Sequence, residues 1–377
     1  MKIALFGASG FIGYDFLRLL MERGGATPVV YCTSARNVTN LVRHDLDIRL
    51  VPYAQMGALK LDRDIDMIVN FLHPFGNREE FGPEEQTEIF LDFIARAKQQ
   101  QPKLRLIHLS SFSVYEPFDE GTHFTERDQL APPKSDDYAT SKVLIERRLR
   151  ALPEAKQWQL HLRPTFVYGP FCKPWTDGLM AAFSQGDLLA KAAAGRMQPL
   201  AVRDLSEFML ARVTDFQPGI FNIAGREEVT WETFLKFFEG VVGRGKLVID
   251  PDADLAPKRE GIISYVKNNF QDLMRVCVKQ KSFNNLVVPI SMKFPLRVRN
   301  AVHRRLGTSP DQPVRGKGGA KGPTPFMHPF IEEDRLASID RLLAKFPDWR
   351  TSTLAENEEL MRKYFAFRFT DGEDEKD

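Results

Sequence analysis

Two side chains that could share a proton stand four residues apart, at Tyr138 and Lys142. On a helix this spacing places both on one face. A lysine cation beside a phenol lowers the phenol pKa from its usual value of about 10. Ser111 comes just after the apolar run 104–109, and a hydroxyl at the carboxyl end of a strand could hydrogen-bond the same substrate oxygen. Together the three groups could move the proton of a substrate hydroxyl near neutral pH.

None of these residues is informative alone. A Tyr and a Lys at this spacing occur by chance and usually mark a solvated helix face, and a serine at a strand end is commonly only a cap. Their meaning therefore depends on the elements that position them.

The start of the chain predicts such an element. An apolar run over 3–6 leads to glycines at three-residue spacing, and apolar residues continue at helical spacing beyond them. This is typical of a strand, a tight turn and a helix whose N-terminus holds a pyrophosphate, although an ordinary glycine-rich turn is the simpler alternative. The predicted dinucleotide-binding residues here are Gly7, Ser9, Gly10, Phe11, Ile12 and Gly13.

The end of the second predicted strand, 28–32, bears on the choice of dinucleotide. NAD usually meets an acidic residue there, whereas the 2′-phosphate of NADP meets an arginine. Positions 31–33 carry no acidic residue, while Ser34 and Arg36 could hold a phosphate. This favours NADP over NAD, unless Arg36 is merely a solvated loop residue.

Hydrophobic periodicity continues through the chain. It predicts strands near 47–53, 66–72, 104–109, 160–170 and 219–225, and helices near 83–100, 137–152, 177–185, 230–240 and 354–364. The alternation indicates an α/β fold, a doubly wound parallel (Rossmann) sheet with a smaller, mixed C-terminal substrate-binding region. We expect a dinucleotide-binding domain over 1–170, with 200–225 returning to it, and a substrate-binding region over 171–199 and 226–365. Residues 309–325 are expected to form a flexible loop and 366–377 a disordered acidic tail.

Composition excludes several functions. A net charge of +2 over 377 residues gives no electrostatic case for nucleic acid. No run approaches the roughly 18 apolar residues of a membrane span. The three cysteines lie far apart and fit a reduced, cytoplasmic protein. Neither the cysteines nor the seven histidines show metal-ligand spacing, so no metal is assigned.

The stretch 292–307 mixes basic and apolar residues. It could touch a membrane surface, although a packed helix with a basic face explains these residues more simply.

Several strings carry a family resemblance. The main matching segments are 7–13, 66–70, 110–115, 138–142 and 163–170, and two further segments that match are 202–205 and 221–225. On these segments the chain resembles the extended short-chain dehydrogenase/reductases, the NAD-dependent epimerase/dehydratase family that includes UDP-galactose epimerase. The resemblance covers the chain to about residue 240. It implies a homodimer formed through helices 83–100 and 137–152.

The resemblance also implies roles for single residues. Tyr138 would be the acid/base, Lys142 would bind the ribose and lower the tyrosine pKa, and Ser111 would meet the substrate carbonyl. Phe71 and Leu72 would line the cofactor, and Pro164 with Val167 would flank the nicotinamide. The candidate substrate-binding residues are His73, Ser113, Phe166 and Arg259.

Two departures from the family pattern narrow the chemistry. The 4,6-dehydratases carry an Asp-Glu pair after the active Ser or Thr, where this chain has Phe112 and Ser113, and this disfavours dehydration. The family's substrate-phosphate Asn is Phe166 here. The leading hypothesis is an NAD(P)-dependent epimerase or reductase acting on a nucleotide-linked sugar. The alternatives are an NADPH-dependent ketone reductase on an apolar, non-nucleotide substrate, and a non-catalytic dinucleotide-sensing protein.

Overall fold

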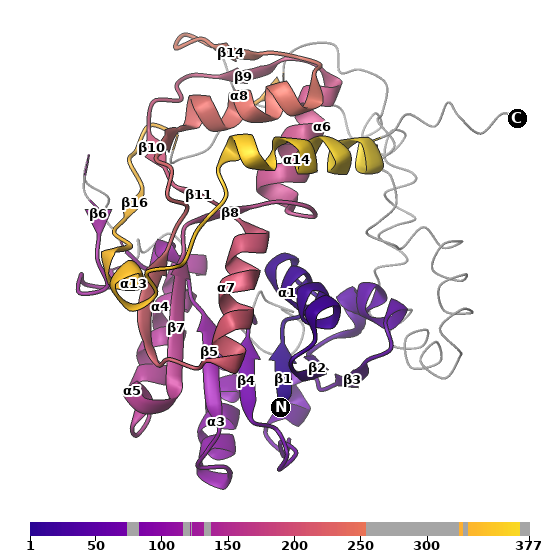
Figure 1. Cartoon of the computed structure of the whole chain (residues 1–377), viewed down its shortest axis with the longest axis vertical. Coiled ribbons are helices and arrows are strands. Elements are labelled where there is room, and N and C mark those ends of the chain that lie inside the picture. The colour runs from indigo at the N-terminus through magenta and orange to yellow at the C-terminus, as the bar shows by residue number, and fades with distance from the viewer. Residues whose placement is uncertain are drawn as a thin grey trace, which may run out of the picture.

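The computed structural model describes residues 1–73, 83–115, 121, 123–131, 137–253, 324–326 and 331–369. Its centre is a seven-stranded sheet in which every neighbouring pair of strands is parallel (Figure 1). In spatial order the strands are β12 (Gly219–Ile223), β7 (Gln159–Pro164), β5 (Arg105–Leu109), β4 (Met67–Asn70), β1 (Lys2–Phe6), β2 (Thr27–Cys32) and β3 (Asp47–Leu50). The central strands are short apolar runs buried on both faces, which is the composition that a parallel sheet requires.

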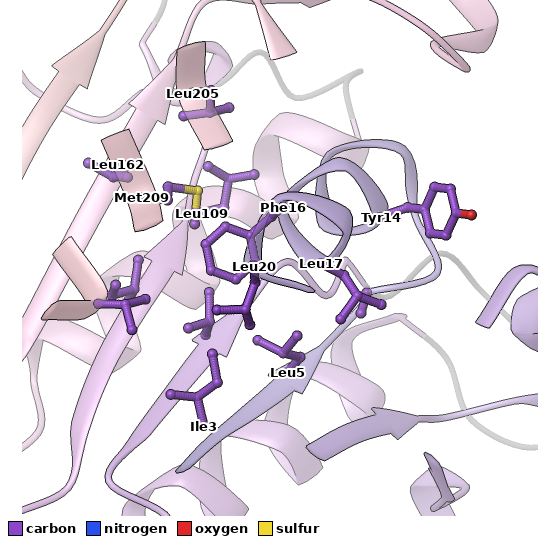
Figure 2. Close-up of a cluster of buried hydrophobic side chains, with 14 of the residues drawn as sticks. Ile3, Leu5, Tyr14, Phe16, Leu17, Leu20, Leu109, Leu162, Leu205 and Met209 are labelled. Atoms are coloured by element: carbon purple, nitrogen blue, oxygen red, sulfur yellow. The ribbon is translucent and has the colours of Figure 1, made fainter. Parts of the chain in front are cut away.

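Helices cover both faces of this sheet. On one face α1 (Phe11–Arg23) packs beside α7 (Val202–Thr214), and on the other α3 (Pro83–Gln100) packs beside α4 (Asp137–Arg150). Figure 2 shows the core of the first face, where side chains of β1, α1 and α7 meet, among them Ile3, Leu5, Phe16, Leu20, Leu205 and Met209. The predicted doubly wound parallel sheet is confirmed.

A smaller, mixed region lies above the sheet in Figure 1. It contains the helices α6 (Gly178–Gln185), α8 (Trp231–Val242) and α14 (Leu354–Phe369), with a sheet of β14 (Leu247–Ile249), β9 (Leu188–Ala190) and β15 (Thr324–Pro325). Its core is rich in aromatic side chains, including Phe183, Trp231, Phe234 and Phe238.

The predicted strand 160–170 is in fact two strands. After β7 the chain leaves the large sheet, and β8 (Phe166–Tyr168) pairs in parallel with β11 (Pro199–Ala201). Thr165 stands at the break. Its N–H donates to the last carbonyl of β12 (3.1 Å), and its hydroxyl donates to the carbonyl of Gln198 (2.6 Å), the residue just before β11.

Short elements complete the described chain. They are α2 (Tyr53–Met56), α5 (Ala155–Trp158), α13 (Asp340–Lys345), the 3₁₀ helices η1 (Ala35–Arg43) and η2 (Phe112–Val114), the π-helical turn η3 (Lys173–Asp177), and the two-stranded pairs β10 (Arg196–Met197) with β13 (Val229–Thr230) and β16 (Leu336–Ala337) with β6 (His123–Phe124). No helix within the described residues is both long and apolar enough to cross a membrane.

Some predicted segments have another structure. The strand expected over 47–53 stops at Leu50, because Pro52 precedes the short helix α2. Residues 366–369 of the expected tail are helical, because Phe369 is buried and stacks on Phe365 at 5.3 Å. Thr324 and Pro325, expected in a flexible loop, pair with β9 instead. The rest of that loop, the stretch 292–307 and the tail beyond 369 lie outside the described residues.

Candidate active site

The turn after β1 requires its glycines. Gly7 has a φ of +80°, and a Cβ there would lie 2.8 Å from the Leu72 nitrogen. A Cβ on Gly13 would lie 2.5 Å from the Gly7 carbonyl oxygen and 2.9 Å from the Ala8 Cα. The turn thus packs directly on the chain leaving β4, and α1 packs directly on the turn.

The N-terminus of α1 fits a diphosphate. Gly10 is its N-cap residue, and with no side chain it offers no capping hydrogen bond to the first turn. Gly10 is exposed, while Ser9, Phe11 and Ile12 are half-buried. Amide groups left uncapped at the positive end of a helix dipole form an anion site. The observed turn therefore suits the pyrophosphate that the glycine spacing predicts.

Replacing Gly13 with Ala is expected to destabilise the protein by about 1–3 kcal/mol, because the new methyl group would overlap fixed backbone atoms. Gly240 in α8 is the matched control, since a Cβ there meets nothing within 4 Å. Gly240→Ala should raise stability by up to about 1 kcal/mol through helix propensity alone. Urea denaturation measures both changes. Equal effects of the two substitutions would contradict the steric account of the turn.

Lys142 connects α4 to the end of β5. It is 3% exposed, and its Nζ donates a hydrogen bond to the Leu109 carbonyl (2.9 Å). Burial lowers its pKa to about 8, against the opposing charge of Glu146 one turn further along α4. The same Nζ lies 5.8 Å from the centre of the Tyr138 ring. The helix therefore places the ammonium group and the phenol ring close together, as their spacing predicts.

His73 is the third member of this group. Its ring meets the Tyr138 ring edge to face, with 4.6 Å between the centroids, and its Nδ1 lies 3.4 Å from the Ser141 hydroxyl. That hydroxyl donates to the Tyr138 carbonyl (2.9 Å). Burial, with a smaller contribution from the charge of Lys142, lowers the pKa of His73 to about 3. A neutral imidazole therefore stands beside the phenol at physiological pH.

Ser111 lies at the same end of β5, two residues beyond the carbonyl that holds Lys142. It is the N-cap residue of η2: its Oγ accepts from the Ser113 N–H (3.2 Å) and lies 2.7 Å from the Ser113 hydroxyl. The structure thus gives Ser111 a capping role, and its role toward a substrate stays a prediction.

The remaining predicted site residues fall in different places. Phe71 and Leu72 follow β4 beside Gly7 and are half-buried, and Pro164 and Val167 are buried on either side of Thr165. The Phe166 ring packs edge to face against Trp175 and Trp231, at 5.5 and 5.3 Å. Ser34 precedes η1 and makes no capping hydrogen bond. The Arg36 side chain and the whole of Arg259 lie outside the described residues.

A buried polar network below the site was not predicted from the sequence. Glu146 and Arg163 are both fully buried and form an ion pair, with 3.0 Å between Arg163 Nε and Glu146 Oε2. Ser110 also donates to Glu146 (2.8 Å). Arg163 donates to the Tyr115 hydroxyl, which donates to Asn222 (2.8 Å). Burial alone would raise the pKa of Glu146, but the hydrogen bonds and charge of Arg163 outweigh burial and lower it to about 2.

The strings 110–115 and 163–170 already contained three members of this network, Ser110, Tyr115 and Arg163. Arg163, a charged residue inside a predicted strand, was the available signal, because a buried charge needs a partner. Among the described residues no group of three or more His, Cys, Asp or Glu side chains could share a metal ion.

A doubly wound parallel sheet with a glycine turn after its first strand, and a lysine anchored where β5 ends, defines a dinucleotide-binding protein of the Rossmann type. Within that class the chain belongs to the NAD-dependent epimerase/dehydratase family, whose sequence pattern matches residues 3–224. It is an enzyme of the extended short-chain dehydrogenase/reductase type. A comparison with curated protein sequences found no match.

Solved structures share this fold at low sequence identity. UDP-glucuronic acid 4-epimerase from Bacillus cereus is 16% identical, with a TM-score of 0.61 over 97% of this chain and 99% of the epimerase. UDP-glucose 4-epimerase from Thermus thermophilus is 18% identical, with a TM-score of 0.54 over 71% and 93%. dTDP-glucose 4,6-dehydratase from Bacillus anthracis is 20% identical, with a TM-score of 0.55 over 66% and 85%. At these identities the likeness concerns the fold.

Proposed function

We propose that the protein is an NAD(P)-dependent epimerase or reductase that acts on a nucleotide-linked sugar. The observation that carries this proposal is the grouping of Tyr138, Lys142 and His73 at the carboxyl ends of β4 and β5. Ligands of open α/β sheets bind at this edge. The structures of the epimerases from B. cereus and T. thermophilus are complexes with NAD, and the first also holds UDP-glucuronic acid, which supports the same ligand classes here.

Each residue has a defined part in the proposed reaction. The nicotinamide dinucleotide, when bound, supplies the hydride chemistry. Tyr138 takes or gives the proton of the substrate hydroxyl, and the Lys142 cation stabilises the phenolate that results. Ser111 hydrogen-bonds the same substrate oxygen. The glycine turn holds the diphosphate through backbone N–H groups of α1.

The end of β2 bears on the choice between NAD and NADP. No acidic residue stands at positions 31–33, so a ribose 2′-hydroxyl lacks its usual carboxylate partner there. Together with Ser34 and Arg36 this supports NADP, whereas the family description and the neighbours' NAD complexes support NAD. Calorimetric titration with NAD and NADP separates the two. Tighter binding of NAD would overturn the preference for NADP.

The experiment that tests the reaction starts with the purified full-length chain. Any copurified dinucleotide is released and identified by mass. The protein is then incubated with UDP-glucose or UDP-glucuronic acid, and the sugar is followed by proton NMR. An epimerised sugar without net change of the dinucleotide supports an epimerase, and a reduced sugar with consumption of reduced dinucleotide supports a reductase. Failure to bind either dinucleotide would overturn the proposal.

One observation favours a second candidate, an NADPH-dependent reductase of an apolar ketone. Phe166, where the family pattern has a polar substrate contact, lies in an aromatic cluster with Trp175 and Trp231. Steady NADPH consumption with an aromatic ketone, and none with nucleotide sugars, would choose this function.

The pH dependence of turnover tests the role of Lys142. Its pKa of about 8 lies below the ordinary lysine value of 10.5, so it loses its proton as the pH rises through about 8. We expect kcat to fall there, because the cation beside the phenol disappears. Between about pH 8 and 10.5 the unfolded chain holds a proton on Lys142 that the folded protein has released. In that window Lys142 therefore makes the free energy of unfolding rise with pH, while kcat falls. A kcat that stays flat to pH 10 would contradict the assignment.

We also propose a cytoplasmic homodimer formed through α3 and α4. These helices lie side by side on one face of the sheet, where Arg148 and Glu88 form an exposed ion pair between them. Light scattering gives the solution mass, and a monomer at micromolar concentration would overturn the dimer.

A further inference from the structure

Three polar side chains cross the interior of the sheet directly beneath the site. Asn70, His108 and His161 occupy neighbouring strands in register, Asn70 opposite His108 and His108 opposite His161. Asn70 and His108 are completely buried, and His161 is 2% exposed. Sheet interiors of this kind are normally apolar, so each of these polar groups needs a structural reason.

The hydrogen bonds fix both the orientation of the Asn70 amide and the tautomer of His108. The Asn70 Oδ1 accepts the Leu72 N–H (2.9 Å), which leaves the Asn70 Nδ2 facing His108 Nδ1 at 3.0 Å. An amide nitrogen can only donate, so His108 Nδ1 is the acceptor and the ring proton is on Nε2. Burial, and then the charges of His161 and Lys142, lower the pKa of His108 well below its usual value, which keeps this acceptor unprotonated.

The Leu72 peptide contacts the glycine turn and immediately precedes the residue that packs on Tyr138. Its nitrogen is one of the atoms that a Cβ on Gly7 would meet at 2.8 Å, so the glycine turn rests on it. The next residue, His73, meets the Tyr138 ring. A shift of this peptide would therefore move the predicted diphosphate turn and the neighbour of the phenol together.

We propose that His108 is a positioning residue of this site, which acts through Asn70 on the Leu72 peptide and thereby on the dinucleotide turn and on Tyr138. This inference rests on the proposed function, because it assigns His108 to a dinucleotide site. It does not make His108 a catalytic residue: the hydrogen bond it makes through Nδ1 goes to Asn70, and its Nε2 has no hydrogen-bond partner among the described residues.

Two substitutions at one position separate positioning from packing. His108→Asn keeps an acceptor oxygen near the place of Nδ1, whereas His108→Leu removes it and leaves the buried Asn70 N–H without a partner. We expect the Kd for the dinucleotide to rise about tenfold or more in His108→Leu and to stay within about threefold of wild type in His108→Asn. The value of kcat at saturating dinucleotide should fall in the same order.

A second histidine of the same row provides the matched control. His161 bonds to Gln159 through Nε2 (2.7 Å), and that bond does not involve Asn70. His161→Leu should reduce stability as His108→Leu does, yet leave the dinucleotide Kd within about threefold of wild type. A folded His108→Leu with wild-type affinity, or equal losses of affinity in His108→Leu and His161→Leu, would overturn the proposal.

The tautomer is tested on the wild-type protein, so the inference does not depend on whether the variants fold. Long-range ¹H–¹⁵N spectra at pH 7 should show that the His108 ring is protonated on Nε2 and unprotonated on Nδ1. A charged ring, or a proton on Nδ1, would overturn the inference. This measurement needs no ligand, so a wild-type protein that bound no dinucleotide would refute the proposed function separately.

Discussion

Tyr138→Phe is expected to lower kcat by about 10²- to 10⁴-fold, which is the usual contribution of a general acid/base. The substitution removes the hydroxyl and keeps the ring. The edge-to-face contact with His73 at 4.6 Å and the approach of Lys142 at 5.8 Å should therefore persist. Dinucleotide affinity, measured by calorimetry, should remain within a few-fold of wild type, since the glycine turn is untouched.

Tyr364→Phe is the matched control for loss of a tyrosine hydroxyl. Tyr364 lies on α14, where its hydroxyl donates to Asp177 (2.5 Å), and it has no part in the proposed chemistry. Its kcat should stay close to wild type even if stability falls. Turnover retained in Tyr138→Phe, measured on the substrate that the wild type converts, would show that another group carries the proton.

Glu146→Gln is expected to destabilise the protein by about 3–5 kcal/mol. The neutral amide keeps the shape of the side chain but leaves the Arg163 charge, which is fully buried, without its counter-charge. Urea denaturation at pH 7 measures the loss. It should exceed the loss from most single substitutions, because few remove the partner of a buried charge.

The control for this change is Glu88→Gln. Glu88 pairs with Arg148 across α3 and α4, but both side chains are exposed, so the expected loss is at most about 1 kcal/mol.

The dependence of stability on acid pH is a further check of the Glu146 charge. The folded-state pKa of Glu146 is about 2, below the ordinary value of 4.5, so the stability that its charge contributes is lost as the pH falls through this window. The difference between wild type and Glu146→Gln should shrink there, and a difference at pH 7 as small as that of Glu88→Gln would contradict the account.

The parts of the fold that depend on local pattern could be predicted from the sequence. The helix expected over 83–100 has the bounds of α3, because its apolar residues recur at helical spacing from a proline start. The glycine turn was equally accessible, because the apolar run over 3–6 and the three-residue spacing of the glycines that follow it are local in the sequence. The closeness of Tyr138 and Lys142 could be predicted because it depends only on their four-residue spacing within one helix.

The features that depend on distant partners could not be predicted. The strand pattern of the sequence continues from β7 into β8, and only pairing with β11, more than thirty residues later, moves β8 into another sheet. The Glu146 and Arg163 pair joins a helix to a strand that carry no shared pattern. His108 was likewise one histidine among seven, because its meaning comes from Asn70 on the neighbouring strand.

The path of the chain between the large sheet and the smaller region determines which fragments of the molecule can fold. The chain passes from the large sheet to the smaller region after β7 and returns through α7 to supply β12, the outermost strand. A gene fragment that stopped at residue 170 would lack β12 and α7, exposing the hydrogen-bonding edge of β7 and the apolar side of α1. Such a fragment should aggregate instead of binding a nucleotide. Because the chain passes from the large sheet to the smaller region and back, we expect that neither region folds when it is expressed alone.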